Sequence, residues 1–96
     1  MITNITVQDL KEKLSGQPFI IDVRSPEEHE KGHIDTAQNF PIGDLPKNLD
    51  TLREHDTIYV HCQMGGRSKR ASDYLTKEGL NAINIEGGWD AWTKLS

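Results

Sequence analysis

The chain has 96 residues, and we expect residues 1–96 to form one small domain with a single core. Its composition, 34% hydrophobic and 27% charged, is typical of a globular protein. The formal net charge of −4 argues against nucleic acid as a ligand, because the chain offers no general surface that could neutralise phosphates. No stretch is long and apolar enough to span a membrane, so we expect no membrane partner.

Cysteine usage and the first residues indicate a compartment. Cys62 is the only cysteine, so no disulfide can form within the chain. Residues 1–4 lack the basic and then apolar pattern of a signal peptide. We therefore expect a protein of the reducing cytoplasm, in which any disulfide or persulfide exchange at this cysteine uses a partner molecule. Nothing in the sequence demands an oligomer, and we expect a monomer.

The first third of the chain predicts a helix, a strand and a second helix. Thr6 is a good N-cap for an amphipathic helix that ends at Gly16. The nearly continuous apolar run 19–24 predicts a strand that is covered on both faces. In residues 25–28, a capping Ser, a Pro at the first helical position and a Glu at the third indicate the start of a helix, which Gly32 ends.

The rest of the chain continues to alternate between strands and helices. In chain order, the sequence predicts a short strand at 37–40, one or two helical turns at 45–52, a strand at 57–62, a helix at 68–78 ended by Gly79, a strand at 81–85 and a final helix after Gly87 and Gly88. Such alternation is typical of an α/β fold in which helices cover both faces of a parallel sheet. Ligands of such folds bind beyond the carboxyl ends of the strands, where Cys62 and Arg24 lie.

The segment from Cys62 to Arg67 is a loop between an apolar strand and a helix, with Ser68 as the expected N-cap of that helix. Gly65 and Gly66 ease a tight curve in which backbone N–H groups can converge on the cysteine sulfur. The positive end of the helix dipole points at the same place, and both effects favour the nucleophilic thiolate. A lone buried cysteine can instead be a small core hydrophobe, but an inert position does not require a glycine-rich turn ended by an arginine.

Basic residues crowd the first turn of the helix after this loop. Arg67, Lys69 and Arg70 lie there, where cations oppose the helix dipole. A site that recruits anions would explain this placement, and Arg67 is the candidate for holding an anionic donor, since a guanidinium can bind two oxygens at once. For Lys69 and Arg70 a solvated charged face is an equal alternative, with Lys69 paired to Asp73 one turn later.

Four segments, taken together, resemble a single-domain rhodanese, which is a sulfurtransferase module. They are Ile21-Asp22-Val23-Arg24 with Pro26-Glu27-Glu28; Gly32-His33-Ile34 leading to Ala37, Asn39 and Pro41; Val60-His61-Cys62 through Arg67-Ser68; and Glu86-Gly87-Gly88-Trp89 with Trp92. The resemblance implies a three-layer sandwich in which helices flank both faces of a five-stranded parallel sheet. It also implies that Cys62 is the catalytic nucleophile, in a substrate-binding loop made of Gln63, Met64, Gly65, Gly66, Arg67 and Ser68.

The activity that this resemblance implies is the transfer of a sulfane sulfur. The Cys62 thiolate would attack the outer sulfur of thiosulfate or a persulfide, and the resulting Cys62 persulfide would pass its sulfur to cyanide, a thiol or a protein cysteine in a ping-pong scheme. Loop amides would stabilise charge on the sulfur and on the leaving sulfite. The chemistry needs neither a metal nor an organic cofactor. The expected partners are a small anionic sulfur donor and a thiol or protein-cysteine acceptor.

The chain departs from the family pattern at two places. Thiosulfate-using members often carry a basic residue directly after the cysteine, whereas Gln63 and Met64 follow Cys62 here. This departure weakens the case for thiosulfate and leaves room for a persulfide or a protein partner. Thr36 stands where many relatives have a glycine, which affects a turn rather than the chemistry.

Two other functions remain as alternatives. A cysteine phosphatase of the same fold would share the Cys62 and Arg67-Ser68 pattern, but phosphatases place five residues between Cys and Arg, and this chain has four. A convincing general acid is also lacking, since Asp35 and Asp44 are candidates by residue type only. A non-catalytic binding or sulfur-carrier module is the second alternative, although relatives that lose activity usually lose the cysteine.

The remaining polar candidates have structural interpretations. His61 precedes the nucleophile in a strand, so its side chain should point to the opposite face. Asp22 and Arg24 are expected to form a buried ion pair that supports the loop, unless Arg24 lines the rim of the pocket. Trp89 and Arg70 are the other candidates for the rim. No metal site is expected, because the remaining histidines lack ligand spacing; they are His29, His33 and His55.

Overall fold

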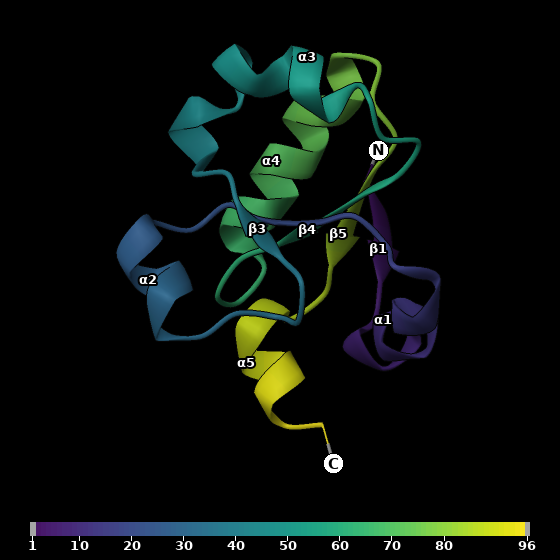
Figure 1. Cartoon of the computed structure of the whole chain (residues 1–96), viewed down its shortest axis with the longest axis vertical. Coiled ribbons are helices and arrows are strands. Elements are labelled where there is room, and N and C mark those ends of the chain that lie inside the picture. The colour runs from purple at the N-terminus through teal and green to yellow at the C-terminus, as the bar shows by residue number, and fades with distance from the viewer. Residues whose placement is uncertain (1, 96) are drawn as a thin grey trace.

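The computed structural model of the chain describes residues 2–95, which form a five-stranded sheet with helices on both faces (Figure 1). The strands are β1 (Thr3–Ile5), β2 (Ile20–Asp22), β3 (Gln38–Asn39), β4 (Ile58–His61) and β5 (Ala82–Ile85). The helices are α1 (Val7–Lys13), α2 (Pro26–Lys31), α3 (Leu49–Leu52), α4 (Gly66–Lys77) and α5 (Gly88–Thr93), with 3-10 turns at Leu14–Gly16, Ile42–Asp44 and Pro46–Asn48. All paired strands are parallel, in the order β1-β5-β4-β2-β3, which confirms the predicted α/β architecture.

The N-terminal signals of the first two helices act as the sequence predicts. The Asp9 N–H donates to the Thr6 hydroxyl at 3.1 Å, so Thr6 caps α1. At α2, the Glu28 N–H donates to the Ser25 hydroxyl at 3.2 Å and the Ser25 N–H donates to the Glu28 carboxylate at 3.1 Å. These two reciprocal bonds form a complete capping box, with Pro26 at the first helical position.

Two elements differ from the sequence-based expectation. β1 adds an edge strand that the residue pattern did not predict, because Thr3–Ile5 is mostly polar and has no apolar run. Its backbone pairs with β5, with Asn4 opposite Asn84. The other difference is at α4, which begins at Gly66 rather than at Ser68, so Ser68 is not the N-cap of that helix. The cap is Gly65, whose φ of 119° suits a glycine.

The sheet divides the apolar core into two layers. Ile20 and Ile21 follow each other in β2 and enter opposite layers, as the two-residue period of a strand requires. One layer joins Ile21 to Leu75 of α4, and the other joins Ile20 to Leu10 of α1. Cys62 belongs to the first layer, together with α4 residues. The nucleophile candidate therefore sits where the end of β4 meets α4.

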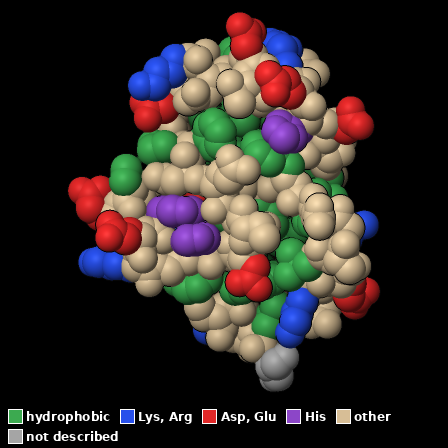
Figure 2. Space-filling view, in the orientation of Figure 1, with side chains coloured by type: hydrophobic (Ala, Val, Ile, Leu, Met, Phe, Trp, Pro, Cys, Tyr) green, Lys and Arg blue, Asp and Glu red, His purple; other side chains and the backbone are tan. Residues whose placement is uncertain are grey.

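The surface carries charges of both signs. On the face shown in Figure 2, acidic and basic side chains are interspersed around the margin, so this face has no continuous basic surface. This mixture of signs agrees with the small formal net charge of −4. Among residues 2–95, no helix combines the length and apolar character that crossing a membrane requires.

A buried polar cluster lies at the carboxyl ends of β2 and β4. Arg24 and Asp22 form an ion pair at 2.7 Å, and both side chains are almost completely buried. His29 of α2 contacts the same carboxylate through Nδ1 at 2.9 Å. His61 lies 3.5 Å from that carboxylate through Nε2 and contacts the Cys62 carbonyl through Nδ1 at 3.0 Å. The expected buried ion pair is confirmed, and it links β2, α2 and β4.

His61 is held in its neutral form by this environment. Burial lowers the pKa of His61 to about 4, although the nearby Asp22 carboxylate opposes the shift. Its Nδ1–H donates to the Cys62 carbonyl, which leaves Nε2 as an acceptor for the Ile34 N–H at 3.4 Å. Burial alone would raise the pKa of Asp22, but hydrogen bonds from the Arg24 side chain and backbone and from His29 outweigh it and lower that pKa.

We predict that mild acid weakens the fold through His61. Its pKa is lower in the folded chain than the ordinary 6.5, so its contribution is complete above pH 6.5 and is lost as the pH falls towards 4. The loss should reach about 3 kcal/mol of the free energy of unfolding. Urea titrations between pH 7 and pH 4 measure it. The fall in the free energy of unfolding between pH 7 and pH 4 should disappear in His61→Gln and persist in His55→Gln. A wild-type protein whose free energy of unfolding does not change over this range would contradict the prediction.

A second prediction concerns the turn at Thr36. This β-branched residue is exposed and has a φ of 68°, in the left-handed region that glycine adopts without strain. Thr36→Gly should therefore raise the free energy of unfolding by roughly 1 kcal/mol. Thr36→Ala, which keeps a Cβ, is the matched control and should show no such gain. Thermal and urea unfolding measure both variants, and a destabilised glycine variant would refute the argument.

Candidate active site

Cys62 follows directly after β4 and opens onto a shallow surface depression of about 380 Å³. The residue is only 1% exposed, so its side chain is almost completely enclosed at the edge of this depression. The Gly65 N–H donates to Sγ at 3.0 Å, and the first turn of α4 begins immediately afterwards. A backbone donor and a helix N-terminus thus face the sulfur together, and both favour a negative charge there.

Ser68 lies beneath the sulfur instead of capping the helix. Its side chain is fully buried, and its hydroxyl oxygen is 3.3 Å from Cys62 Sγ. The same hydroxyl lies 3.1 Å from the Gly65 carbonyl and 2.5 Å from Asn84 Oδ1. Because α4 begins two residues earlier than expected, Ser68 falls in its first turn, where the side chain can face the sulfur.

The loop backbone is fixed from below by the N-terminus of α5. The Trp89 N–H donates to the Cys62 carbonyl at 2.8 Å, and the Asp90 N–H donates to the Gln63 carbonyl at 3.0 Å. Gly88 has a φ of 53°, and a Cβ there would collide with the Cys62 carbonyl. The glycine pair after β5 therefore serves close approach of α5 to the loop. This contact holds the carbonyl side of the loop, which leaves its N–H side for the sulfur.

The side chain of Gln63 is bound inside the protein. Its Oε1 accepts a hydrogen bond from Arg24 Nη1 at 2.9 Å, and its Nε2 donates to Asp90 Oδ1 at 2.5 Å. Arg24 also lies over the Trp89 ring, 5.9 Å from its centroid. Arg24 and Trp89 therefore support the loop from behind, and neither lines the depression. Arg70, the third rim candidate, does line it.

Arg67 makes a two-pronged ion pair with Glu28 of α2. Nη1 donates to Oε1 at 2.7 Å and Nη2 donates to Oε2 at 2.9 Å, with about a third of each side chain exposed. The hydrogen bonds from Arg67 lower the pKa of Glu28 to about 2. Both terminal nitrogens of the guanidinium are thus engaged by a carboxylate, and an anionic donor would have to compete with it.

The rest of the depression is made by Met64, Gly66 and Arg70. Met64 is 71% exposed and is the only large hydrophobic side chain exposed within the described part of the chain. Asp73 pairs with Lys77 at 3.0 Å, and not with Lys69 as the charged-face alternative would have it. The mouth of the site is therefore apolar at the loop tip and basic along α4.

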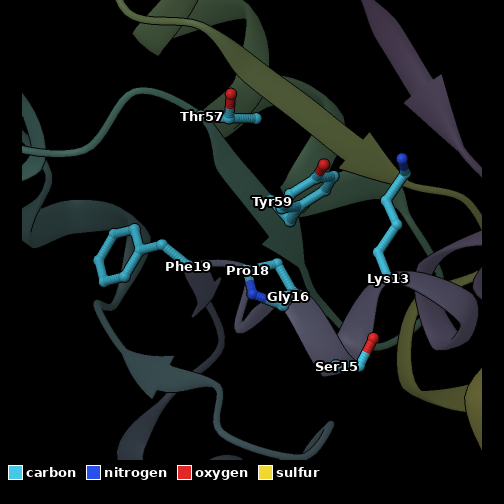
Figure 3. A pocket seen from close by; sticks show the side chains of 7 residues that line it. All are labelled: Lys13, Ser15, Gly16, Pro18, Phe19, Thr57 and Tyr59. Carbon is cyan, nitrogen blue, oxygen red and sulfur yellow. The ribbon is translucent and has the colours of Figure 1, made fainter.

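A second pocket and a pair of stacked histidines lie outside this depression. A pocket at the amino ends of β2 and β4 has no nucleophilic cysteine or carboxylate, and Figure 3 shows its lining: Lys13, Ser15, Gly16, Pro18, Phe19, Thr57 and Tyr59. The rings of His29 and His33 stack with centroids 3.7 Å apart. Across residues 2–95, however, no group of three or more metal-ligating side chains comes together.

Three residues of the site were not singled out from the sequence. Glu28 was assigned only to the helix cap, and its second contact lies 39 positions away in the chain. Asp90 carried no signal beyond its place after the glycine pair. Asn84 did carry one, since it is a polar residue in an otherwise apolar strand, next to the strand that ends at Cys62.

Comparisons with known proteins agree with this geometry. Residues 6–95 match the family model described as a rhodanese-like domain. The chain is 36% identical to the "Putative sulfurtransferase YtwF" of Bacillus subtilis, over 95% of this chain and 90% of that protein. It is also 36% identical to the "Putative sulfur carrier protein YrkF" of the same organism, of which it spans about half, 51%.

Solved structures give the same result. The crystal structure of SSP1007 from Staphylococcus saprophyticus superposes with a TM-score of 0.88 at 39% identity, and covers 95% of this chain and 93% of that one. The agreement in sequence extends over almost all of the chain and includes the strand, loop and helix that hold Cys62. The chain therefore belongs to the rhodanese family, whose members include rhodanese-like sulfurtransferases.

Proposed function

We propose that the chain is a sulfurtransferase that carries sulfur as a persulfide on Cys62. The observation that carries the proposal is the Gly65 N–H on Sγ, 3.0 Å away, at the N-terminus of α4 and at the floor of an open depression. A backbone donor and a helix end of this kind stabilise a negatively charged sulfur, and the adjoining depression gives a second reactant a place to bind. The family membership supports the same chemistry.

The proposed reaction has two half-reactions. In the first, the Cys62 thiolate attacks the outer sulfur of the donor, the bond between that sulfur and the rest of the donor breaks, and the leaving group departs with the bonding electrons. With thiosulfate the leaving group is sulfite. In the second, an acceptor thiolate or cyanide attacks the terminal sulfur of the persulfide, and the Cys62 thiolate is restored. The Gly65 amide and the end of α4 stabilise the sulfur charge in both halves.

The contacts around the loop favour a persulfide or protein-bound donor over thiosulfate. Glu28 engages both terminal nitrogens of Arg67, which reduces the attraction for a small dianion. Gln63 adds no positive charge, because its side chain is a neutral amide, and its two hydrogen bonds hold that amide between Arg24 and Asp90. The exposed Met64 next to the sulfur offers an apolar contact that a protein or a thiol with a larger body can use.

Two other functions are weaker on this geometry. A phosphatase would need a wider loop for a tetrahedral phosphate and a general acid near the leaving group, and neither Asp35 nor Asp44 lines the depression. The other alternative is a sulfur carrier without catalysis, which is the class that the name of YrkF suggests for that protein. Such a carrier would also hold a persulfide, and it differs only in needing a catalytic partner. We further propose that the chain acts as a monomer in a reducing compartment, since nothing in its sequence demands an oligomer and its single cysteine allows no disulfide within the chain.

Mass spectrometry of the intact protein tests the persulfide directly. After brief incubation with thiosulfate or with a small-molecule persulfide, the mass should rise by one sulfur atom, and cyanide should remove it. Cys62→Ser should gain nothing, because the nucleophile is absent. A wild-type protein that gains no sulfur from either donor would refute the proposed function. A gain from the persulfide alone would support the donor preference given above.

The Arg67–Glu28 pair predicts a specific change in donor affinity. Glu28→Gln keeps the capping box but removes the carboxylate that competes for Arg67, so the KM for thiosulfate should fall about threefold, as expected for loss of one exposed charge contact. Glu27→Gln is the matched control, since it makes the same change of charge at an exposed position in the same helical turn. Steady-state kinetics compare the two. A KM that rises in Glu28→Gln would mean that the pair holds the site together instead of competing with the donor.

A further inference from the structure

A chain of hydrogen bonds runs from the Cys62 sulfur to the surface at β1. Cys62 Sγ lies 3.3 Å from Ser68 Oγ, and Ser68 Oγ lies 2.5 Å from Asn84 Oδ1. Asn84 Nδ2 in turn lies 2.9 Å from Asn4 Oδ1. The first three residues are 0 or 1% exposed, whereas Asn4 is exposed on the edge strand. The mechanism proposed above uses neither asparagine.

The direction of this chain is set by the single hydrogen of the Ser68 hydroxyl. Three acceptors surround that hydrogen: Cys62 Sγ, the Gly65 carbonyl and Asn84 Oδ1. The contact with Asn84 Oδ1 is the shortest of the three, which assigns the hydroxyl hydrogen to Asn84. The thiol then donates to Ser68, and Asn84 Nδ2 donates to Asn4. Every hydrogen bond of the chain points away from the sulfur. This direction suits the thiol and withholds the hydroxyl hydrogen from a thiolate.

The thiolate form of Cys62 is favoured by the opposite direction of these hydrogen bonds. When the thiol proton leaves to water in the open depression, the sulfur can only accept, and Ser68 can turn its hydrogen towards it. Asn84 Oδ1 would then lose its donor in a fully buried position, which is unfavourable. Rotation of the Asn84 carboxamide by half a turn removes this conflict, because Nδ2 then donates to Ser68 and Oδ1 faces Asn4. The exposed amide of Asn4 can rotate in the same way and donate to Asn84.

We propose that Asn84 and Asn4 are positioning residues that set the direction of the hydrogen bond between Ser68 and the Cys62 sulfur. The thiol and the thiolate correspond to the two opposite donor-to-acceptor directions of this row of hydrogen bonds. The exposed end of the chain, on β1, thereby controls how readily the buried sulfur ionises. This inference rests on the proposed use of Cys62 as a nucleophile, but it can be tested without sulfur transfer.

The test uses substitutions at Asn4, the exposed end, to fix the direction of the hydrogen bonds. Asn4→Asp offers only acceptors, so Asn84 keeps Nδ2 towards position 4 and the Ser68 hydrogen stays on Asn84. Asn4→Lys offers only donors and imposes the opposite direction. Alkylation of Cys62 by neutral iodoacetamide is measured against pH, in about 1 M salt, where the Debye length is only about 3 Å. Below the midpoint of the rate profile, Asn4→Asp should react about three- to tenfold more slowly and Asn4→Lys correspondingly faster, the range for one hydrogen bond.

Controls separate direction from charge. Thr3→Asp and Thr3→Lys place the same charges one residue away, on the opposite face of the strand, and should leave the profile unchanged. Ser68→Ala should slow alkylation at low pH, because the thiolate loses its hydroxyl donor. All of these variants leave intact the charged or titratable groups around the sulfur. They are Arg67 and Arg70 on α4, Glu28 on α2, Asp22 and Arg24 at the end of β2, His61 in β4 and Asp90 on α5.

The proposal is overturned if the Asn4 variants move the profile no more than the Thr3 variants do, or if Ser68→Ala speeds alkylation. The outcome is independent of the proposed function. If the wild-type protein gains no sulfur from any donor while the Asn4 variants shift alkylation in opposite directions, the sulfurtransferase proposal fails and this inference stands. If sulfur is gained and the Asn4 variants do not shift alkylation, this inference alone fails.

Discussion

The buried pair of Asp22 and Arg24 is the interaction on which the site depends. Arg24 donates to Asp22, to the Gly32 carbonyl at 2.6 Å and to Gln63, so one guanidinium joins β2, the end of α2 and the reactive loop. A buried ion pair adds little net stability over an apolar pair of the same size, because removing both charges from water is costly. Its value here is geometric, since removing either partner would leave an unpaired charge beneath the loop.

The two sides of the loop backbone after Cys62 have different roles: its carbonyl groups accept hydrogen bonds from other parts of the protein, and its N–H groups face the sulfur. The N-terminus of α5 binds the carbonyls of Cys62 and Gln63, and His61 Nδ1 binds the first of these as well. With the carbonyl side fixed below, the Gly65 N–H and the end of α4 face the sulfur. The same backbone turn therefore satisfies its own acceptors and presents donors to an anion, which is why the fold needs glycine at Gly65 and Gly88.

Local signals in the sequence predicted most of the fold, and its long-range contacts were beyond them. The predictions of the helix caps at Thr6 and Ser25 and of strand β2 were correct, because each of these features depends on residues that are adjacent in the sequence. β1 forms only because β5 offers a free edge, which no local pattern in a polar segment can reveal. The partner of Arg67 was missed for the same reason: Glu28 already had a local explanation as a capping residue, and the second contact exists only in the folded chain.

The reactivity of the sulfur and the choice of its partners arise from different parts of the loop. In the proposed chemistry, reactivity depends on the Gly65 N–H, on the end of α4 and on the buried Ser68, all of which face the sulfur from inside the protein. Partner choice depends on side chains at the mouth, where Met64 is exposed and Arg67 is balanced by Glu28. For the proposed reaction, a change at the exposed and uncharged Met64 would therefore alter the contact with a donor or an acceptor and leave the charged groups around the sulfur in place. A chain of this size can in this way keep one chemistry while its surface adapts to a particular partner.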